Sequence, residues 1–380
     1  MSTEQSALDT IDTLKRRYEQ GASLRELARD FKMSHESVRR RLIGAGVRMR
    51  PRGEPRAYAL DEDTYAQLRK EYEGGMTIAE MANKWHVSRD ALRSALARAK
   101  VNLHLHVLGR REDGYHLLDS LVVFPELGDR LEAEPAAGLS LSVAGPFADQ
   151  LPSDGGNLVL RAAEALAARA PGRGAALRLE KALPVAGGIG GGSADAAAAL
   201  RALSRLWGLR PGDAEGLALG LGADVPVCLG APRPAMMGGI GEVLRPAPAL
   251  PALWLTLANP GLPVATAEVF RRLERRDGRA AEAPARFETA AALADWLAAQ
   301  SNMLEAAAEA VAPAVGALRR EIGGLEGCLL ARMSGSGGTC FGLFAEDRAA
   351  LAAAEALRAR GVWAAAAPVR ASAPLAAVGG

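Results

Sequence analysis

The hydrophobic and polar positions follow two different periods along the chain, and the change falls near residue 100. The segment Leu24–Phe31 carries its apolar residues at spacings of three and four, which predicts one face of a short helix. Between Val101 and Val107 apolar residues alternate with polar ones, which predicts a half-buried strand. The pattern therefore predicts a helical N-terminal region and a body that contains strands.

An internal repeat fills the N-terminal region. The segment Ser23–Ala28 recurs 54 residues later as Thr77–Ala82, and Ser34 recurs as Ser88. Each serine stands just before a second helical pattern, where its hydroxyl can accept a hydrogen bond from a free amide of the first turn. The repeat predicts two helix-turn-helix units, at about residues 11–50 and 65–100, in an all-α region that covers residues 1–98.

The charges of the N-terminal region suggest an anionic partner. Residues 1–100 hold 20 Lys and Arg against 15 Asp and Glu, whereas the whole chain has a formal net charge of only +2. Arg39, Arg40 and Arg41 lie on the second predicted helix of the first unit. Such an arrangement can follow the phosphates of duplex DNA. The alternative is a pair of helical hairpins whose arginines only face water.

The body contains a glycine-rich segment that predicts a phosphate site. Five glycines stand between Leu183 and Asp195, after a predicted strand at Leu177–Leu179 and before an alanine-rich helix that runs to about Leu206. Free amides and the dipole at the start of that helix favour a phosphate group. The segment lacks the ending of a Walker A loop and the third glycine of a dinucleotide fingerprint. A flexible connector is the alternative, but the flanking strand and helix argue against it.

Three further segments complete the predicted body. Leu158–Ala168 has the pattern of an amphipathic helix. Asp224 precedes the strand-like run Val225–Leu229, so its carboxylate is a candidate base beside an apolar segment, or else a turn residue or a helix cap. A second glycine loop, Ser334–Gly338, precedes a predicted strand at Cys340–Phe344. Helices and strands in this order indicate an α+β body.

Metal, disulfide and membrane chemistry find little support in the sequence. His104 and His106 would share one face of a strand, but no third ligand is evident near them, so we predict no metal site made of protein ligands. The three cysteines show no paired spacing, and we expect free thiols in a reducing compartment. No apolar run approaches the roughly 20 residues that cross a bilayer, and the polar start shows no signal-peptide pattern. We expect a cytoplasmic protein without a membrane partner.

Six segments together resemble the GHMP small-molecule kinases, the superfamily of galactose, homoserine, mevalonate and phosphomevalonate kinases. The resemblance covers Ala99–Ala371, and its segments are Ala99–Leu103, Gly109–His116, Pro184–Ala194, Leu221–Pro226, Asn259–Gly261 and Ser334–Phe344. The glycine loop marks the superfamily. The segment Gly109–His116, with Lys100 and Asn102 before it, is similar to the branch that phosphorylates the 2-hydroxyl of a cytidine-diphosphate substrate in isoprenoid precursor biosynthesis.

The resemblance implies a two-lobed kinase fold and a set of site residues. It implies that Lys100 and Asp224 form the catalytic pair, with Asp224 as the base for the attacking hydroxyl. It implies that the substrate binds to Asn102, Tyr115, His116 and Phe270, the last three at its cytosine. It also implies that ATP, accompanied by Mg²⁺, binds to Pro184, Val185, Ala186, Gly187, Gly188, Ile189, Gly190, Gly191, Gly192, Ser193 and Ala194.

The domain boundaries follow from the repeat and the resemblance. After the helix-turn-helix region at residues 1–98, we expect an N-terminal kinase lobe at 99–250 and a C-terminal lobe at 251–380. Three prolines between residues 246 and 251 suggest the boundary between the lobes. Residues Asp90–Ala97 have a helical pattern that runs directly into Lys100, whereas the family begins with a short strand at this place.

Two other functions remain open at this point. A kinase of the same superfamily that acts on another small alcohol would keep the same chemistry. A helix-turn-helix transcriptional regulator would use the kinase-like body only to sense a metabolite. The basic N-terminal region favours that regulator, whereas the presence of Lys100, Ser193 and Asp224 together argues against it.

Overall fold

The computed structural model describes residues 11, 13–15, 17–18, 27–28, 31, 33–45, 94–152 and 155–371. The chain divides into two compact units, residues 1–95 and residues 96–380. Within the described residues, no helix is both long and apolar enough to cross a membrane. Each unit is described below by itself.

The first unit contains the predicted capped helix of the first repeat. Helix α3 spans His35–Gly44, and the Ser34 hydroxyl accepts a hydrogen bond from the Ser37 amide at 3.1 Å. Five apolar side chains form a small buried core: Leu14, Tyr18, Leu27, Val38 and Leu42. This packing agrees with the helical spacing seen in the sequence. Residues 46–93, which hold most of the second predicted unit, lie outside the described residues.

The helical pattern expected up to residue 97 is wrong for its last residues. Ser94–Arg98 forms strand β1, which lies beside β5 (Gly128–Ala136) at the edge of a sheet. The Ala99 amide continues this contact with a 2.8 Å hydrogen bond to the Leu127 carbonyl. A side chain at Gly128 would collide with the backbone of Ala97, so the glycine permits the close approach. Pairing in the sheet therefore outweighs the helix preference of the alanines and arginines.

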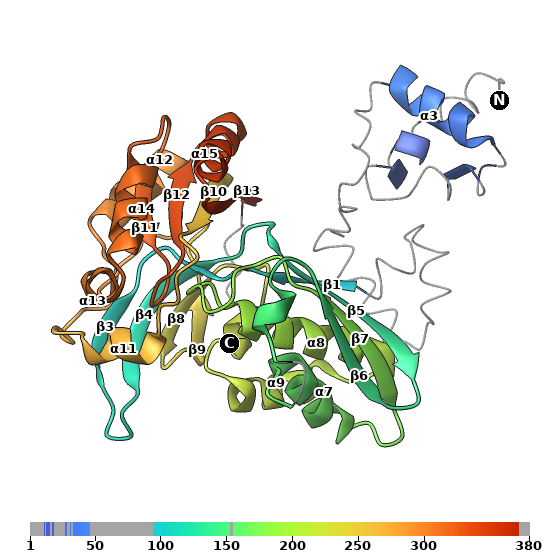
Figure 1. The fold of residues 1–380 in the computed structure, drawn as a ribbon, viewed down its shortest axis with the longest axis horizontal. Coiled ribbons are helices and arrows are strands. Elements are labelled where there is room, and N and C mark those ends of the chain that lie inside the picture. Colours follow the sequence, from blue (N-terminus) through green and yellow to red (C-terminus); the bar gives the residue numbers. More distant parts are fainter. Residues whose placement is uncertain are drawn as a thin grey trace. The chain divides into compact units, whose positions relative to one another are not determined.

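In the part of the chain that the structure describes, two sheets are formed by strands before residue 250 (Figure 1). The first has the strand order β1-β5-β7-β6, and the second has the order β2-β4-β8-β9 with β3 also paired to β4. Their remaining strands are β2 (Val101–Asn102), β3 (His106–Arg110), β4 (His116–Val123), β6 (Leu139–Ala144), β7 (Gly174–Glu180), β8 (Ala235–Gly239) and β9 (Val243–Pro246). The strand predicted from Val101 to Val107 is thus interrupted, and both halves pair with β4. It is also buried on both faces, since His104 is 0% exposed.

The helices of this part include α7 and α8, which pack against the first sheet, and α9 and α10, which pack against α8 (Figure 1). They are η1 (Ala148–Gln150), α7 (Leu158–Ala167), α8 (Gly191–Trp207), α9 (Pro211–Leu221) and α10 (Val225–Leu229). The helices predicted at Leu158–Ala168 and up to about Leu206 are confirmed as α7 and α8. The strand-like interpretation of Val225–Leu229 is wrong, because a proline in the first turn fits a helix start.

A third sheet and five helices make up the rest of the body. Its antiparallel strands have the order β11-β12-β10-β13, and helices α12, α14 and α15 pack against them. The strands are β10 (Leu253–Asn259), β11 (Leu330–Met333), β12 (Cys340–Phe344) and β13 (Trp363–Val369). The helices are α11 (Thr266–Arg271), α12 (Ala290–Ala298), α13 (Glu305–Val311), α14 (Pro313–Gly323) and α15 (Asp347–Ala359). The strand predicted at Cys340–Phe344 is confirmed, and all three cysteines are free.

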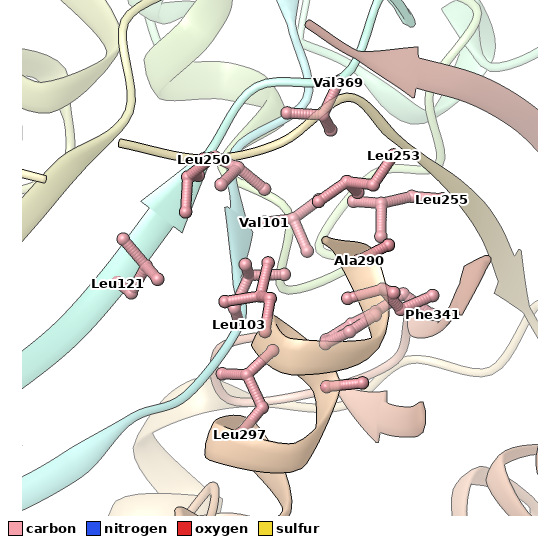
Figure 2. Close-up of a cluster of buried hydrophobic side chains, with 14 of the residues drawn as sticks. Val101, Leu103, Leu121, Leu250, Leu253, Leu255, Ala290, Leu297, Phe341 and Val369 are labelled. Carbon is pink, nitrogen blue, oxygen red and sulfur yellow. The ribbon is translucent and has the colours of Figure 1, made fainter. Parts of the chain in front are cut away.

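One apolar cluster joins the strands before and after residue 250 (Figure 2). Val101, Leu121, Leu255 and Phe341 meet in it, each 0% exposed. Strand β9 ends at Pro246 and β10 begins the third sheet at Leu253, so the change of sheet falls near the proposed lobe boundary. Leu183 and Ile189 enter the same cluster, also at 0% exposure. The glycine-rich segment is therefore anchored in the core just before its start and at its centre.

Candidate active site

Lys100 and Asp224 lie side by side although 124 residues separate them. Lys100 Nζ donates a hydrogen bond to Asp224 Oδ2 at 2.7 Å. The lysine side chain is 5% exposed and the aspartate side chain 32% exposed. The carboxylate at the start of α10 can therefore reach a bound molecule, while the ammonium group stays fixed beside it.

The glycine-rich segment passes directly against Lys100. The Lys100 amide donates to the Ile189 carbonyl at 2.8 Å. At Gly190, a Cβ would lie 3.2 Å from Lys100 Cε, and the backbone has φ 62°. Both the left-handed conformation and the close approach favour glycine at this position. The structure thus brings Lys100, Asp224 and the segment Pro184–Ala194 together.

The local structure of the segment Pro184–Ala194 suits the binding of an anion. Pro184–Gly190 is a loop, and Gly191, Gly192, Ser193 and Ala194 form the first turn of α8. That first turn contains no acidic residue. The free amides and the positive end of a 17-residue helix therefore face the loop, and no carboxylate of that turn competes for them.

The second glycine loop holds the first one in place, a contact that the sequence did not reveal. The Thr339 amide donates to the Gly187 carbonyl at 2.9 Å, and the Ser334 hydroxyl donates to the Gly188 carbonyl at 3.1 Å. Ser334 also accepts the Asn102 amide at 3.1 Å. The segment Ser334–Thr339 therefore links the phosphate loop to the strand that follows Lys100.

Of the expected substrate residues, two form a pair, one is buried and one is exposed. His116 stacks on Phe270 with ring centroids 4.7 Å apart and an interplanar angle of 23°. Burial, followed by the charges of Arg276 and Arg110, lowers the pKa of His116. Asn102 is 0% exposed and donates its side-chain amide to Ser120 at 2.8 Å, while its Oδ1 has no partner within the described residues. Tyr115 is 57% exposed.

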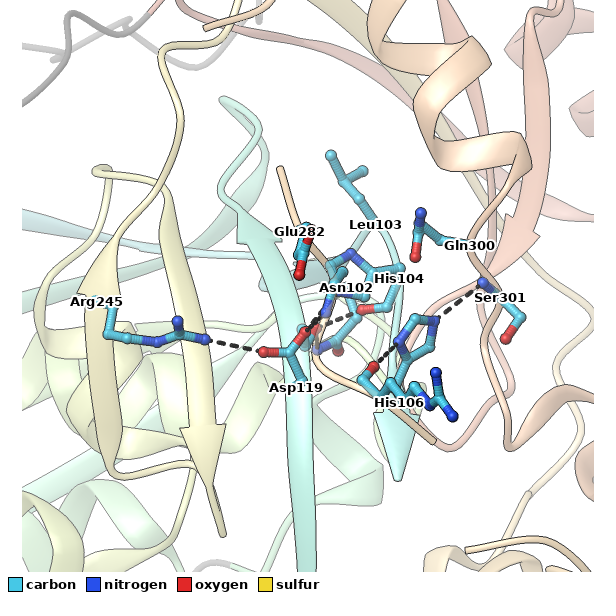
Figure 3. Close-up of polar contacts among 12 residues, drawn as sticks. Asn102, Leu103, His104, His106, Asp119, Arg245, Glu282, Gln300 and Ser301 are labelled. Carbon is cyan, nitrogen blue, oxygen red and sulfur yellow. Dashed lines mark hydrogen bonds and ion pairs between the residues drawn. The ribbon is translucent and has the colours of Figure 1, made fainter. Parts of the chain in front are cut away.

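A buried polar cluster lies next to Asn102 (Figure 3). The three donor atoms of His104, His106 and Asp119 lie within 4.8 Å of one another. Asp119 is the third group that the sequence did not reveal, since β3 and β4 place it opposite His106. Two imidazoles and a carboxylate are a donor set that zinc accepts. The surrounding charges therefore decide whether a metal ion can bind to this cluster.

The surrounding charges oppose a divalent cation in this cluster. Asp119 Oδ1 is paired with Arg245 at 2.9 Å, and Oδ2 accepts the Ala281 amide at 2.9 Å. Burial would raise the pKa of Asp119, but the hydrogen bonds from His104 and Ala281 lower it. Burial lowers the pKa of His104, against the raising effect of its hydrogen bond with Asp119. Arg332 contributes to the lowering, so a second guanidinium charge acts on the cluster and opposes a cation. The carboxylate is therefore already compensated, and the cluster is a polar network that connects β3 and β4 to residues 279–281.

Comparison with protein families assigns both parts of the body. Residues 157–231 match the GHMP kinases N-terminal domain, and residues 280–362 match the GHMP kinases C-terminal model. Residues 5–57 match a helix-turn-helix domain. The last match covers the first repeat unit, including α3.

Individual relatives are similar over the body of the chain. A 4-diphosphocytidyl-2-C-methyl-D-erythritol kinase of Cereibacter sphaeroides is 58% identical over 269 residues, which cover 70% of this chain and 94% of the relative. The enzyme of the same name from Paramagnetospirillum magneticum is 56% identical over 265 residues, or 69% of this chain and 92% of the relative. A crystal structure of 4-(cytidine 5'-diphospho)-2C-methyl-D-erythritol kinase is 38% identical, with a TM-score of 0.60 over 73% of this chain and 100% of that one. A homoserine kinase from Cytophaga hutchinsonii, 18% identical with a TM-score of 0.51, shares the fold. The chain belongs to the 4-diphosphocytidyl-2-C-methyl-D-erythritol kinase family of the GHMP kinases.

Proposed function

We propose that the body transfers the γ-phosphoryl group of ATP to the 2-hydroxyl of 4-diphosphocytidyl-2-C-methyl-D-erythritol, a step of non-mevalonate isoprenoid precursor biosynthesis. The observation that carries the proposal is the 2.7 Å contact between Lys100 and Asp224 beside the phosphate loop. A charged pair next to an anion site is what phosphoryl transfer to an alcohol requires. The relatives named above carry the same activity in their names.

In this proposal Asp224 accepts the proton of the attacking hydroxyl. Lys100 Nζ stabilises the ionised carboxylate and offsets negative charge on the transferring phosphoryl group. The amides of the loop and of the first turn of α8 hold the ATP phosphates, which fits the absence of an acidic residue within that turn. Mg²⁺ bound to ATP supplies additional charge neutralisation. Positioning and electrostatics therefore account for the catalysis.

The aromatic pair supports the proposed substrate class. The stacked rings of His116 and Phe270 offer a flat surface of the kind on which a pyrimidine packs, and Tyr115 is close in sequence and exposed. The lowered pKa of His116 keeps its imidazole neutral near pH 7, so one nitrogen can accept a hydrogen bond from the cytosine amino group. A kinase for an alcohol without a base would not need this pair. The cytoplasmic location expected from the sequence stays a prediction.

An ADP-release assay on the full chain tests this function. We expect ADP formation only when 4-diphosphocytidyl-2-C-methyl-D-erythritol is present, with galactose, homoserine and mevalonate as controls. Turnover on one of these alcohols alone would favour another kinase of the superfamily. The absence of turnover on every acceptor, with ATP still bound, would favour a metabolite sensor.

We propose a second function, duplex DNA binding, for the N-terminal unit. Its support is the capped helix α3, on which Arg39, Arg40 and Arg41 are exposed above a small core. Exposed guanidinium groups on the second helix of such a unit suit contact with phosphates and base edges. Body and N-terminal unit would then act on different ligands.

Replacing Arg39, Arg40 and Arg41 together with alanine should weaken binding to a duplex of mixed sequence. The logarithmic salt dependence of the affinity should become shallower by about 0.9 for each phosphate that the variant no longer neutralises. Fluorescence anisotropy of labelled DNA at several salt concentrations measures both quantities. Arg348→Ala, which removes an exposed arginine from α15, is the matched control. Equal affinities for the triple variant and the unchanged chain would refute DNA binding through α3.

A further inference from the structure

Three buried charged side chains lie beneath the phosphate loop, and the proposed chemistry uses none of them. Lys181 Nζ lies 2.5 Å from Asp129 Oδ2 and 2.7 Å from Asp195 Oδ2. The side chains of Lys181, Asp129 and Asp195 are 1%, 0% and 3% exposed. They therefore do not reach a bound nucleotide, and any effect on it must pass through the loop. We call these three residues the buried triad.

The buried triad connects the two ends of the phosphate loop. Lys181 stands three residues before Pro184, and Asp195 directly follows Ala194, so their ion pair closes the loop at its base. Asp129, on β5, contacts the same base of the loop from the side of the sheet. Its Oδ1 accepts the amides of Ala182 at 2.6 Å and Leu183 at 2.8 Å. The start of the loop, its end and the neighbouring strand are thus tied to one ammonium group.

Stability alone is a weak explanation for the buried triad. Removing three charged groups from water costs free energy that their mutual attraction often fails to recover. Asp195 Oδ1 has no hydrogen-bond partner within the described residues, although buried polar atoms are usually satisfied. The benefit of the buried triad is therefore a defined loop geometry, because two charge-assisted contacts fix the position of each end of the loop.

We propose that Asp129, Lys181 and Asp195 are positioning residues that hold the phosphate loop in the conformation that binds ATP. The proposal rests on the function proposed above. Lys181 Nζ also lies 3.1 Å from the place of a Cβ on Gly191, the first residue of α8. The ammonium group and its two carboxylates therefore lie directly behind the helix start that faces the nucleotide phosphates, where they can fix its position.

The test removes the central ammonium group together with one of its two carboxylates. In the double variant Lys181→Met with Asp129→Asn, the Michaelis constant for ATP should rise about tenfold or more, which corresponds to about 1.4 kcal/mol of binding. The turnover number at saturating ATP should change far less, because Lys100 and Asp224 remain. Calorimetry with a non-hydrolysable ATP analogue gives the same comparison without any acceptor. It therefore separates failure of this proposal from failure of the proposed reaction.

A matched pair of substitutions controls for simple destabilisation. Arg319 and Glu309 form a 3.0 Å ion pair between α14 and α13. Arg319→Met with Glu309→Gln should lower the melting temperature and leave ATP affinity unchanged. An unchanged ATP affinity in a folded Lys181→Met and Asp129→Asn variant would overturn the proposal. A loss of affinity of the same size in the control pair would also overturn it.

The charge of Asp195 offers a second, independent measurement. Burial raises the pKa of Asp195 to about 8, against the opposing effect of Lys181, and Asp129 raises it further. Cys228 of α10 also faces this region, and burial raises the pKa of its thiol to about 12, so it stays neutral. As the pH rises through about 8, Asp195 ionises and its 2.7 Å contact with Lys181 becomes an ion pair between two full charges, which holds the base of the loop more firmly. The Michaelis constant for ATP should therefore fall as the pH rises through this range in the unchanged chain, and this decrease should be missing in Asp195→Asn. Identical pH profiles would contradict a positioning function for Asp195.

Discussion

Replacing Asp224 with asparagine should lower the turnover number by about a thousandfold, the scale expected when a general base is lost. The substitution keeps the size of the side chain, so a bound substrate should stay in place and both Michaelis constants should change little. The variant loses the carboxylate, which accepts the hydroxyl proton. In the unchanged chain the same carboxylate lies 2.7 Å from Lys100 as its negative partner. Steady-state kinetics with both substrates checks this division between turnover and binding.

The same substitution should have a modest cost in stability. Lys100 is only 4% exposed and would lose its charged partner, which we expect to cost about 1–3 kcal/mol. Thermal unfolding therefore has to accompany the kinetics, so that loss of fold is not mistaken for loss of chemistry. Asp213→Asn provides the control, since Asp213 stands at the start of α9 and bonds the Arg210 amide at 3.0 Å. Full turnover in Asp224→Asn would refute the base assignment.

Local sequence was sufficient to predict those parts of the structure that depend on residues close together in the chain. Glycines at 187–192 followed by an alanine-rich run predict a loop and a helix, because both depend on backbone freedom and helix preference over a few residues. The cap at Ser34 and the strand at Cys340–Phe344 could likewise be predicted from a few neighbouring residues. The meeting of Lys100 with Asp224 is different, since nothing local to either residue indicates the other. Only the resemblance to a kinase family suggested it.

At Val225–Leu229 the proline was a local signal for a helix start, whereas the other incorrect predictions concern partners that are distant along the chain. Ser94–Arg98 has the composition of a helix, yet β5 offers an open edge and a glycine that allows close pairing. Asp119 could not be recognised as the neighbour of His104 and His106 until the β3–β4 register was known. The buried triad joins residues 129, 181 and 195, and a lone lysine at a strand end gives no sign of two carboxylates below it.

The correction at β1 also decides how the two units can be separated experimentally. A truncation that removes residues 1–98, as the repeat would suggest, also deletes strand β1 and leaves an edge of the first sheet open. Such a protein would test the loss of a strand rather than the loss of the helix-turn-helix unit. A truncation that keeps residues 94–98 preserves the strand that leads into Lys100. Comparing ADP release by that protein and the full chain isolates the effect of the N-terminal unit.

The second large effect is expected at Gly188, in the middle of the phosphate loop. Its backbone has φ 73°, a conformation that costs an L-residue about 1–2 kcal/mol. A Cβ there would also lie 2.5 Å from two carbonyl oxygens, those of Ser334 and Gly337. Both oxygens belong to the backbone of the second glycine loop, so neither can turn aside as a flexible side chain would. Gly188→Ala must therefore push the two loops apart.

Separation of the loops should affect ATP more than the stability of the fold. The contacts from Thr339 to Gly187 and from Ser334 to Gly188 would lengthen, and the amides that face the phosphates would move with them. Because misplacement by about 1 Å can cost about a hundredfold in rate, kcat/KM for ATP should fall by about that factor. Gly220→Ala is the control, since Gly220 lies within α9 and, apart from its chain neighbours and the backbone of that helix, no atom of the described residues lies within 4 Å of its missing Cβ. That variant should keep full activity and gain about 0.5–1 kcal/mol of stability. A Gly188→Ala protein with unchanged kcat/KM for ATP would show that the loop does not bind the nucleotide in the conformation described.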